Sequence, residues 1–87
     1  METYPKVESV AVLAGMRLRI TFVNGEVRVY DCSPLLAEEP FAPLANTAFF
    51  RQARADAHGY GVVWSDSIDL SESELWLNSV PAEQEAA

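Results

Sequence analysis

Four side chains in one short segment are the strongest candidates for chemistry in this sequence. They are Arg17, Arg19, Arg28 and Tyr30, within RLRITFVNGEVRVYD. Guanidinium groups that share one surface can hold carboxylates or phosphates through paired hydrogen bonds. The alternative is a purely structural role, in which these long side chains cover an exposed sheet face. The segment predicts a binding face only if the fold brings the four residues together.

Apolar and polar residues alternate on both sides of Asn24-Gly25, which is typical of a β-hairpin with a two-residue turn. The cross-strand pairs predicted from such a turn are Phe22 with Val27, Ile20 with Val29, and Arg19 with Tyr30. This register gives one apolar face for the core. It places the three arginines and Tyr30 together on the opposite face.

Two carboxylates, Asp66 and Asp69, follow Trp64 and could bind a cation or act as a hydrolase pair. Nothing else in the sequence completes such a site, so Asp69 is interpreted as a turn or helix-start residue before Leu70. Asp31 is interpreted in the same way, as an acceptor for backbone N–H groups where the hairpin ends.

Cys32 and His58 are the single cysteine and the single histidine. One histidine excludes a histidine-cluster metal site, and one cysteine excludes an internal disulfide. Nucleophilic catalysis by a Cys32-His58 pair would need a contact that the sequence cannot show, and His58 before Gly59 is interpreted as a turn residue. We therefore predict no catalytic residue, no metal and no cofactor.

The charge balance points to protein partners. Six basic and thirteen acidic residues give a formal net charge of -7, which repels nucleic-acid phosphates and makes direct nucleic-acid binding unlikely. An acidic surface favours rapid encounter with a basic protein, although it also serves solubility alone. We interpret the chain as a non-enzymatic interaction module.

The N-terminal segment METYPKVESV has no basic stretch followed by an apolar run, and no apolar stretch is long enough to span a membrane. The expected location is the cytoplasm, without contact to a membrane.

The predicted fold class is α+β. Residues 6–13 and the two arms of the hairpin form an antiparallel meander of three strands, with a further strand or hairpin near Trp64. Short helices are expected after Ser33-Pro34, after Asn46 or Thr47, and after Ser71, which stands at capping-box spacing from Glu74.

Residues 5–78 are assigned to a single domain and residues 79–87 to a flexible acidic tail. The residues predicted for the core are Val10, Leu18, Ile20, Phe22, Val27, Val29, Leu36, Phe49, Trp64 and Leu75. A meander this short leaves a strand edge unpaired, which favours a homodimer when no other partner is present.

A set of landmarks in this order resembles the bacterial domain-of-unknown-function family 2442. The landmarks are Pro5, Val7, Val10, Phe22, Asn24-Gly25-Glu26, Arg28, Asp31, Pro34-Leu35-Leu36, Phe41, Leu44, Phe49, Trp64, Asp69-Leu70 and Leu75. The resemblance extends from Pro5 to Leu77 and implies a small α+β domain without family catalytic residues. Some relatives carry a helix-turn-helix domain afterwards, or lie beside a small gene in a pair that looks like a toxin and its antitoxin.

Two functional hypotheses follow. In the first, the chain is an acidic antitoxin-like or regulatory partner of a small basic protein, which a neighbouring gene would encode. The acidic tail, where longer family members continue, argues against a direct transcription-factor role. In the second, the chain is a small-molecule or anion-binding protein, or an enzyme. It would use the Arg17, Arg19, Arg28 and Tyr30 face or the turn from Trp64 to Asp69.

Overall fold

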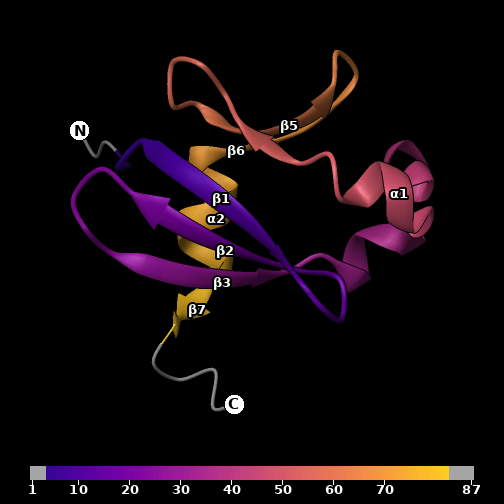
Figure 1. The fold of residues 1–87 in the computed structure, drawn as a ribbon, viewed down its shortest axis with the longest axis horizontal. Helices are drawn as coiled ribbons and strands as arrows, with labels where there is room; N and C mark the ends of the chain where they lie inside the picture. The colour runs from indigo at the N-terminus through magenta and orange to yellow at the C-terminus, as the bar shows by residue number, and fades with distance from the viewer. Residues whose placement is uncertain (1–3, 83–87) are drawn as a thin grey trace.

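The computed structural model describes residues 4–82 as two small antiparallel sheets joined by short helices (Figure 1). Sheet A has the strand order β1-β2-β3-β7, and sheet B has the order β4-β5-β6. The strands are β1 (Val7–Leu13), β2 (Arg17–Phe22), β3 (Val27–Asp31), β4 (Arg54–Ala55), β5 (Gly61–Ser65), β6 (Ile68–Ser71) and β7 (Val80–Pro81). The predicted α+β class, with its three-stranded N-terminal meander and a further hairpin around Trp64, is confirmed.

The loop between β2 and β3 has three residues, 23–25, and not the predicted two. The N–H of Gly25 donates to the carbonyl of Phe22 at 2.9 Å, and the N–H of Phe22 donates to the carbonyl of Glu26 at 2.9 Å. Gly25 has a φ of 90°, a left-handed conformation that a residue with a Cβ adopts only with strain. Three-residue loops that end in a left-handed residue are a common hairpin connection.

The additional loop residue shifts the hairpin register by one. The observed pairs are Arg17 with Asp31, Leu18 with Tyr30, Arg19 with Val29, Ile20 with Arg28, and Thr21 with Val27. Because successive side chains of a strand point to opposite faces, a shift of one residue moves every side chain of β3 to the other face. The predicted register is therefore wrong, and so is the predicted gathering of the three arginines and Tyr30 on one face.

Sheet A has an inner face, which packs on the core, and an outer face. The inner face carries Val7, Val10, Val12, Leu18, Ile20, Phe22, Arg28 and Tyr30. The outer face carries Ser9, Ala11, Leu13, Arg17, Arg19, Thr21, Val27, Val29, Asp31 and Val80. Val27 and Val29, which were predicted for the core, lie on the outer face because of the register shift. Val29 is nevertheless buried by its neighbours on that face, and Val27 only partly.

Two 3-10 helices, η1 (Ser33–Ala37) and η2 (Glu39–Ala45), follow β3. The Asp31 carboxylate accepts the backbone N–H of Ser33 at 3.0 Å, as predicted, and also the Ser33 hydroxyl at 2.8 Å. The helix predicted after Ser33-Pro34 is η1, which begins without a side-chain cap. Leu35 is buried, whereas Leu36, the predicted core residue, is 37 % exposed. Adjacent residues of a helix point in different directions, so only one of the two leucines reaches the core.

The short helix α1 (Thr47–Phe50) begins as predicted, because the side chain of Asn46 accepts the N–H of Phe49 at 3.0 Å. Phe50 is buried, while Phe49, which was predicted for the core, is only partly buried. The indole N–H of Trp64 on β5 donates to the Phe50 carbonyl at 3.0 Å. This bond ties α1 to sheet B and gives the buried indole its hydrogen-bond partner.

The helix α2 (Glu72–Asn78) passes behind sheet A in Figure 1 and covers its inner face. Its first turn is capped as predicted, because the Ser71 hydroxyl accepts the N–H of Glu74 at 3.2 Å. The ring of Trp76 packs edge-on against Phe22, with centroids 5.1 Å apart. Leu75, a predicted core residue, is fully buried. The core therefore lies between sheet A, sheet B and α2.

The chain remains structured beyond Asn78, where the sequence analysis placed the start of the tail. Ser79 is buried, and Val80 and Pro81 of β7 pair with Val29 and Arg28 of β3. The prediction that residues 79–81 fray is wrong, because the cross-strand pairing that holds them involves residues about fifty positions away. Residues 83–87 of the predicted tail lie outside the described residues.

A matched pair of glycine substitutions tests this architecture. A Cβ at Gly61 would overlap the carbonyl oxygen of Leu70 on the neighbouring strand, whereas a Cβ at Gly25 would meet nothing within 4 Å. Gly25→Ala should lower the free energy of unfolding by about 1–2 kcal/mol through its left-handed backbone alone. Gly61→Ala should cost more than about 4 kcal/mol, because backbone must move. Urea titrations measure both; equal losses would contradict the close approach of β5 to β6.

Candidate interaction surface

The four residues predicted for binding are divided between the two faces of sheet A. Arg17 and Arg19 point outward from β2, while Arg28 and Tyr30 point inward from β3. No single ligand can therefore meet all four residues on one surface. Each pair has a different environment and serves a different purpose.

Arg28 connects sheet A to Ser79, the residue that follows α2. Its Nε donates to the Ser79 hydroxyl and its Nη2 to the Ser79 carbonyl, each at 2.7 Å. Its Nη1 lies 3.2 Å from the Glu26 carboxylate. The guanidinium also lies 4.9 Å from the centroid of the Trp76 ring, within the range of a cation–π contact. Arg28 is therefore a structural residue that fixes the end of α2 and the start of β7.

Tyr30 also has a structural partner. The phenol is buried and donates to the Glu74 carboxylate on α2 at 2.8 Å. Burial, assisted by that carboxylate, holds the pKa of Tyr30 well above its ordinary value near 10. The phenol therefore stays neutral at physiological pH and joins β3 to α2.

The outer face is the part of sheet A that no other described element covers. No helix or strand between Val7 and Pro81 lies in front of β1, β2 and β3 in Figure 1, where this face is turned toward the viewer. Three rows of side chains cross it. They are Ala11, Arg19, Val29 and Val80; Ser9, Thr21 and Val27; and Leu13, Arg17 and Asp31.

The outer face combines apolar side chains with two arginines. Val80 is 41 % exposed, and Arg19 is exposed beside Val29. Within residues 4–82, the Arg19 side chain makes no hydrogen bond or ion pair, whereas the Nε of Arg17 donates to the carbonyl of Ala14 at 3.0 Å. The outer face therefore mixes apolar, small polar and charged side chains, and arginine is the one among them that is enriched at protein interfaces.

The residues from Trp64 to Asp69 form no site. Trp64 is buried in the core, Asp66 is exposed in the turn between β5 and β6, and Asp69 is exposed on β6. The interpretation of Asp69 as a turn or helix-start residue is wrong: it alternates with the buried Ile68 and Leu70 along a strand. Asp66 and Asp69 therefore belong to different elements, the β5–β6 turn and β6.

Cys32 and His58 differ completely in their surroundings. The Cys32 side chain is fully buried, and burial raises the pKa of its thiol to about 12. His58 is exposed in a turn, where its backbone N–H donates to the Asp56 carboxylate at 2.8 Å. This agrees with the interpretation of His58 as a turn residue. Among residues 4–82, no cluster of three histidine, cysteine, aspartate or glutamate side chains could hold a metal ion.

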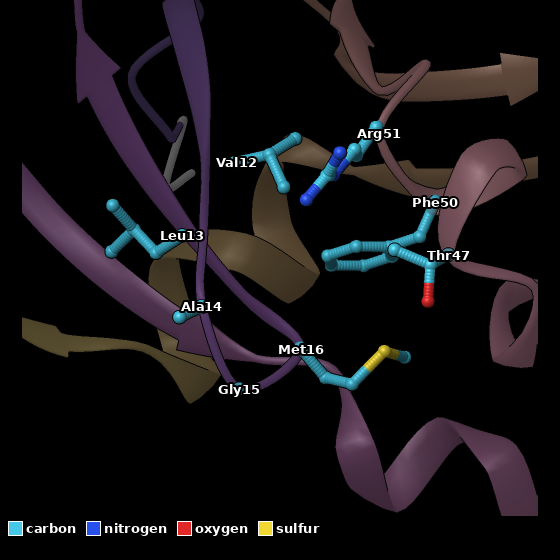
Figure 2. Close-up of a pocket in the computed structure, with 8 residues that line it drawn as sticks. All are labelled: Val12, Leu13, Ala14, Gly15, Met16, Thr47, Phe50 and Arg51. Atoms are coloured by element: carbon cyan, nitrogen blue, oxygen red, sulfur yellow. The ribbon is translucent and has the colours of Figure 1, made fainter.

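Two hollows in the surface were not found from the sequence. The larger, of about 410 Å³, lies between the β1–β2 turn and α1, and Figure 2 shows Met16, Phe50 and Arg51 around it. The smaller, of about 270 Å³, is lined by Glu38, Asp69 and Glu74 together with Leu35, Phe41, Leu70 and Ser71. Each is assembled from segments about thirty residues apart in the chain, so no local motif indicates it.

None of the helices within residues 4–82 has the length and apolar composition that crossing a membrane would require.

The chain is similar to known proteins over nearly its whole length. A family model described as "Protein of unknown function (DUF2442)" matches residues 7–81. The fold is similar to the crystal structure of "Putative DNA Binding Protein NE0471" from Nitrosomonas europaea, with 30 % sequence identity and a TM-score of 0.73. That similarity covers 98 % of this chain and 55 % of the Nitrosomonas chain, so this chain spans little more than half of its length. The curated proteins contain no match.

Replacement of Arg28 tests its structural role. Arg28→Ala removes the bonds to Ser79 and leaves Glu26 without its partner, so the free energy of unfolding should fall by about 2–4 kcal/mol. Arg19→Ala, on the outer face of the same sheet, should change it by less than about 0.5 kcal/mol. Urea denaturation followed by tryptophan fluorescence gives both values. Two similar losses would be inconsistent with the inward position of Arg28.

The raised pKa of Cys32 makes stability depend on pH. Between the thiol's ordinary pKa of about 8.5 and its folded value, the folded chain holds a proton that the unfolded chain releases. The free energy of unfolding should therefore decrease by about 1 kcal/mol between about pH 7 and 9.5 because of this group. Cys32→Ala should show a correspondingly smaller decrease in urea titrations at the two pH values. If the free energy of unfolding changed with pH equally in the wild type and in Cys32→Ala, the thiol would ionise in the folded chain at its ordinary pKa, which contradicts the prediction.

Proposed function

The chain belongs to the DUF2442 family of proteins of unknown function, and we propose that it is a non-enzymatic protein-interaction module. One observation carries the proposal: the outer face of sheet A has no covering layer among the described elements. A sheet normally buries one face against the rest of its domain and leaves the other to water, in which case the second face is polar. Here the second face holds three valines.

The composition of the outer face supports a protein as its occupant. Val80 and the partly exposed Val27 supply apolar area, whereas Val29 is buried beneath its neighbours; Arg19 supplies a planar group that packs on apolar surface and also binds carboxylates. Arginine is enriched at the centres of interfaces, whereas lysine and glutamate are depleted there. A partner with an apolar patch bordered by an acidic side chain would complement this face.

The antitoxin-like form of the proposal rests on charge. A formal net charge of -7 attracts a basic protein over long distances. On the outer face, Arg17 and Arg19 would repel a basic side chain of the partner. A small basic protein would therefore bind the acidic hollow lined by Glu38, Asp69 and Glu74. Reversing a charge on the outer face and reversing one in the acidic hollow should therefore affect binding differently.

The alternative of a small-molecule site or enzyme on the predicted arginine face has less support. Arg28 already donates to Ser79 and Glu26 with three of its nitrogens, and Tyr30 is buried against Glu74. Trp64 lies in the core and cannot line a site at the turn that follows it. Neither location that this alternative requires offers an open group of functional side chains.

DNA binding comes into consideration through the name of the Nitrosomonas protein. A net charge of -7 opposes it in this chain, because affinity for DNA depends on the neutralisation of phosphates by lysine and arginine. Only two arginines lie on the outer face, and Asp31 stands beside them. We therefore propose a protein partner in preference to a nucleic acid. A cytoplasmic location is part of the proposal, since the single cysteine forms no internal disulfide.

Co-purification with the product of the neighbouring gene tests the proposal. If a complex forms through the outer face, Arg19→Glu and Val80→Asp should each weaken it at least about tenfold by calorimetry, since they place charge at the contact. Leu77→Asp is the matched control, because Leu77 is 61 % exposed on α2 and lies away from sheet A's outer face. It should leave the affinity unchanged.

The outcomes separate the surfaces. A complex that tolerates Arg19→Glu but is lost with Asp69→Lys binds at the acidic hollow, which contradicts the outer face and supports the basic partner. Light scattering of the isolated chain tests the homodimer: a dimer lost with Val80→Asp would identify a second copy as the occupant. No complex at low salt and a monomer at every concentration would together refute the interaction proposal.

A further inference from the structure

The larger hollow, which we call the α1 cleft, combines apolar side chains with polar backbone, one hydroxyl side chain and one charged group. It is lined by residues 12–16 of the β1–β2 turn and by Thr47, Phe50 and Arg51 of the α1 segment. Val12, Met16 and Phe50 project toward its interior, whereas the Leu13 side chain points away from it (Figure 2). Its volume of about 410 Å³ is within the range of small-molecule sites, about 300–1,000 Å³.

Arg51 is the polar group of the α1 cleft. Its guanidinium points into the hollow between Val12 and Phe50 in Figure 2. Within residues 4–82 it makes no hydrogen bond, ion pair or cation–π contact, although acidic side chains outnumber basic ones about twofold in the chain. Thr47 adds a hydroxyl to the same wall. The guanidinium therefore keeps its donors available to a ligand.

Met16, at the opposite end of the cleft, has an unusual backbone. Its φ of 62° is left-handed, and Met16 is the only residue other than glycine with a positive φ among residues 4–82. The backbone is held there because the Met16 carbonyl accepts the N–H of Cys32 at 2.7 Å. Positive φ values at the consecutive residues Gly15 and Met16 belong to the tight turn between β1 and β2. The turn places the flexible apolar side chain of Met16 at the cleft.

We propose that the α1 cleft binds a small carboxylic acid with an aliphatic body. The carboxylate pairs with the Arg51 guanidinium, which can donate two parallel hydrogen bonds to it. The aliphatic part replaces water along Val12, Met16 and Phe50. A phosphate or other compact anion would leave these walls without contact, and a neutral apolar molecule would leave Arg51 unpaired. This binding is independent of the protein-interaction role, because none of the side chains that would hold the acid, Val12, Met16, Phe50 and Arg51, belongs to the outer face.

Titration with octanoate, followed by amide NMR of the full chain, tests the proposal. Octanoate should bind saturably at millimolar concentrations and shift the amide signals of residues 12–16 and 47–51. Octanamide, which has the same body without the charge, should bind at least about tenfold more weakly, since a charge-assisted hydrogen bond is lost. Arg51→Gln should weaken octanoate to the same extent. Because Arg51 is exposed and its side chain makes no hydrogen bond or ion pair within residues 4–82, the variant should fold normally.

Arg19→Gln is the matched control, since Arg19 is also exposed and its side chain makes no hydrogen bond within residues 4–82, but it lies outside the cleft. It should bind octanoate with unchanged affinity. The proposal is overturned if Arg51→Gln binds octanoate as the wild type does, if the shifted amides lie elsewhere, or if no saturation occurs. Binding of a leucine-terminated tripeptide without binding of octanoate would assign the cleft to a polypeptide C-terminus and overturn it as well.

Discussion

The left-handed backbone of Gly25 is the constraint on which most of this structure depends. It closes a three-residue loop between β2 and β3 and thereby sets the register of the hairpin. In that register Ile20 pairs with Arg28 and Leu18 with Tyr30, so two polar side chains enter the covered side of the sheet. With a loop one residue shorter, both would point to the outer face, and valines would take their place.

Arg28 and Tyr30 are tolerated inside because α2 and the chain that follows it satisfy them. Glu74 accepts from the phenol, and Ser79 accepts twice from the guanidinium. Within the described residues, no buried side-chain polar atom lacks a partner. These bonds specify where α2 lies on sheet A, which the apolar contacts alone would not do, since hydrophobic attraction has no direction. They also explain why a strand of only two residues, β7, stays in place.

The same register decides the character of the two surfaces. By turning Val27 and Val29 outward it places apolar side chains on the outer face, and it leaves the Arg19 side chain beside them without an acidic partner in the described chain. The turn at Gly15 and Met16, which joins β1 to β2, forms one wall of the α1 cleft. The side chains that would hold a small acid there do not belong to the outer face, so a protein and a small acid could bind together.

The sequence alone determined the features that depend on neighbours along the chain. Alternation located the strands, Asn46 and Ser71 marked the starts of α1 and α2, Asp31 marked the end of β3, and the order of these landmarks identified the family. Only the tertiary structure decided the loop length at Gly25, since two- and three-residue loops both accept Asn-Gly and differ in which strand face is buried. The partners that stabilise the observed choice, Glu74 and Ser79, lie 44 and 51 residues from Tyr30 and Arg28. Three further features depend in the same way on segments distant in sequence, which local patterns do not encode. They are the burial of Leu35 in place of Leu36, the pairing of β7 with β3, and the α1 cleft.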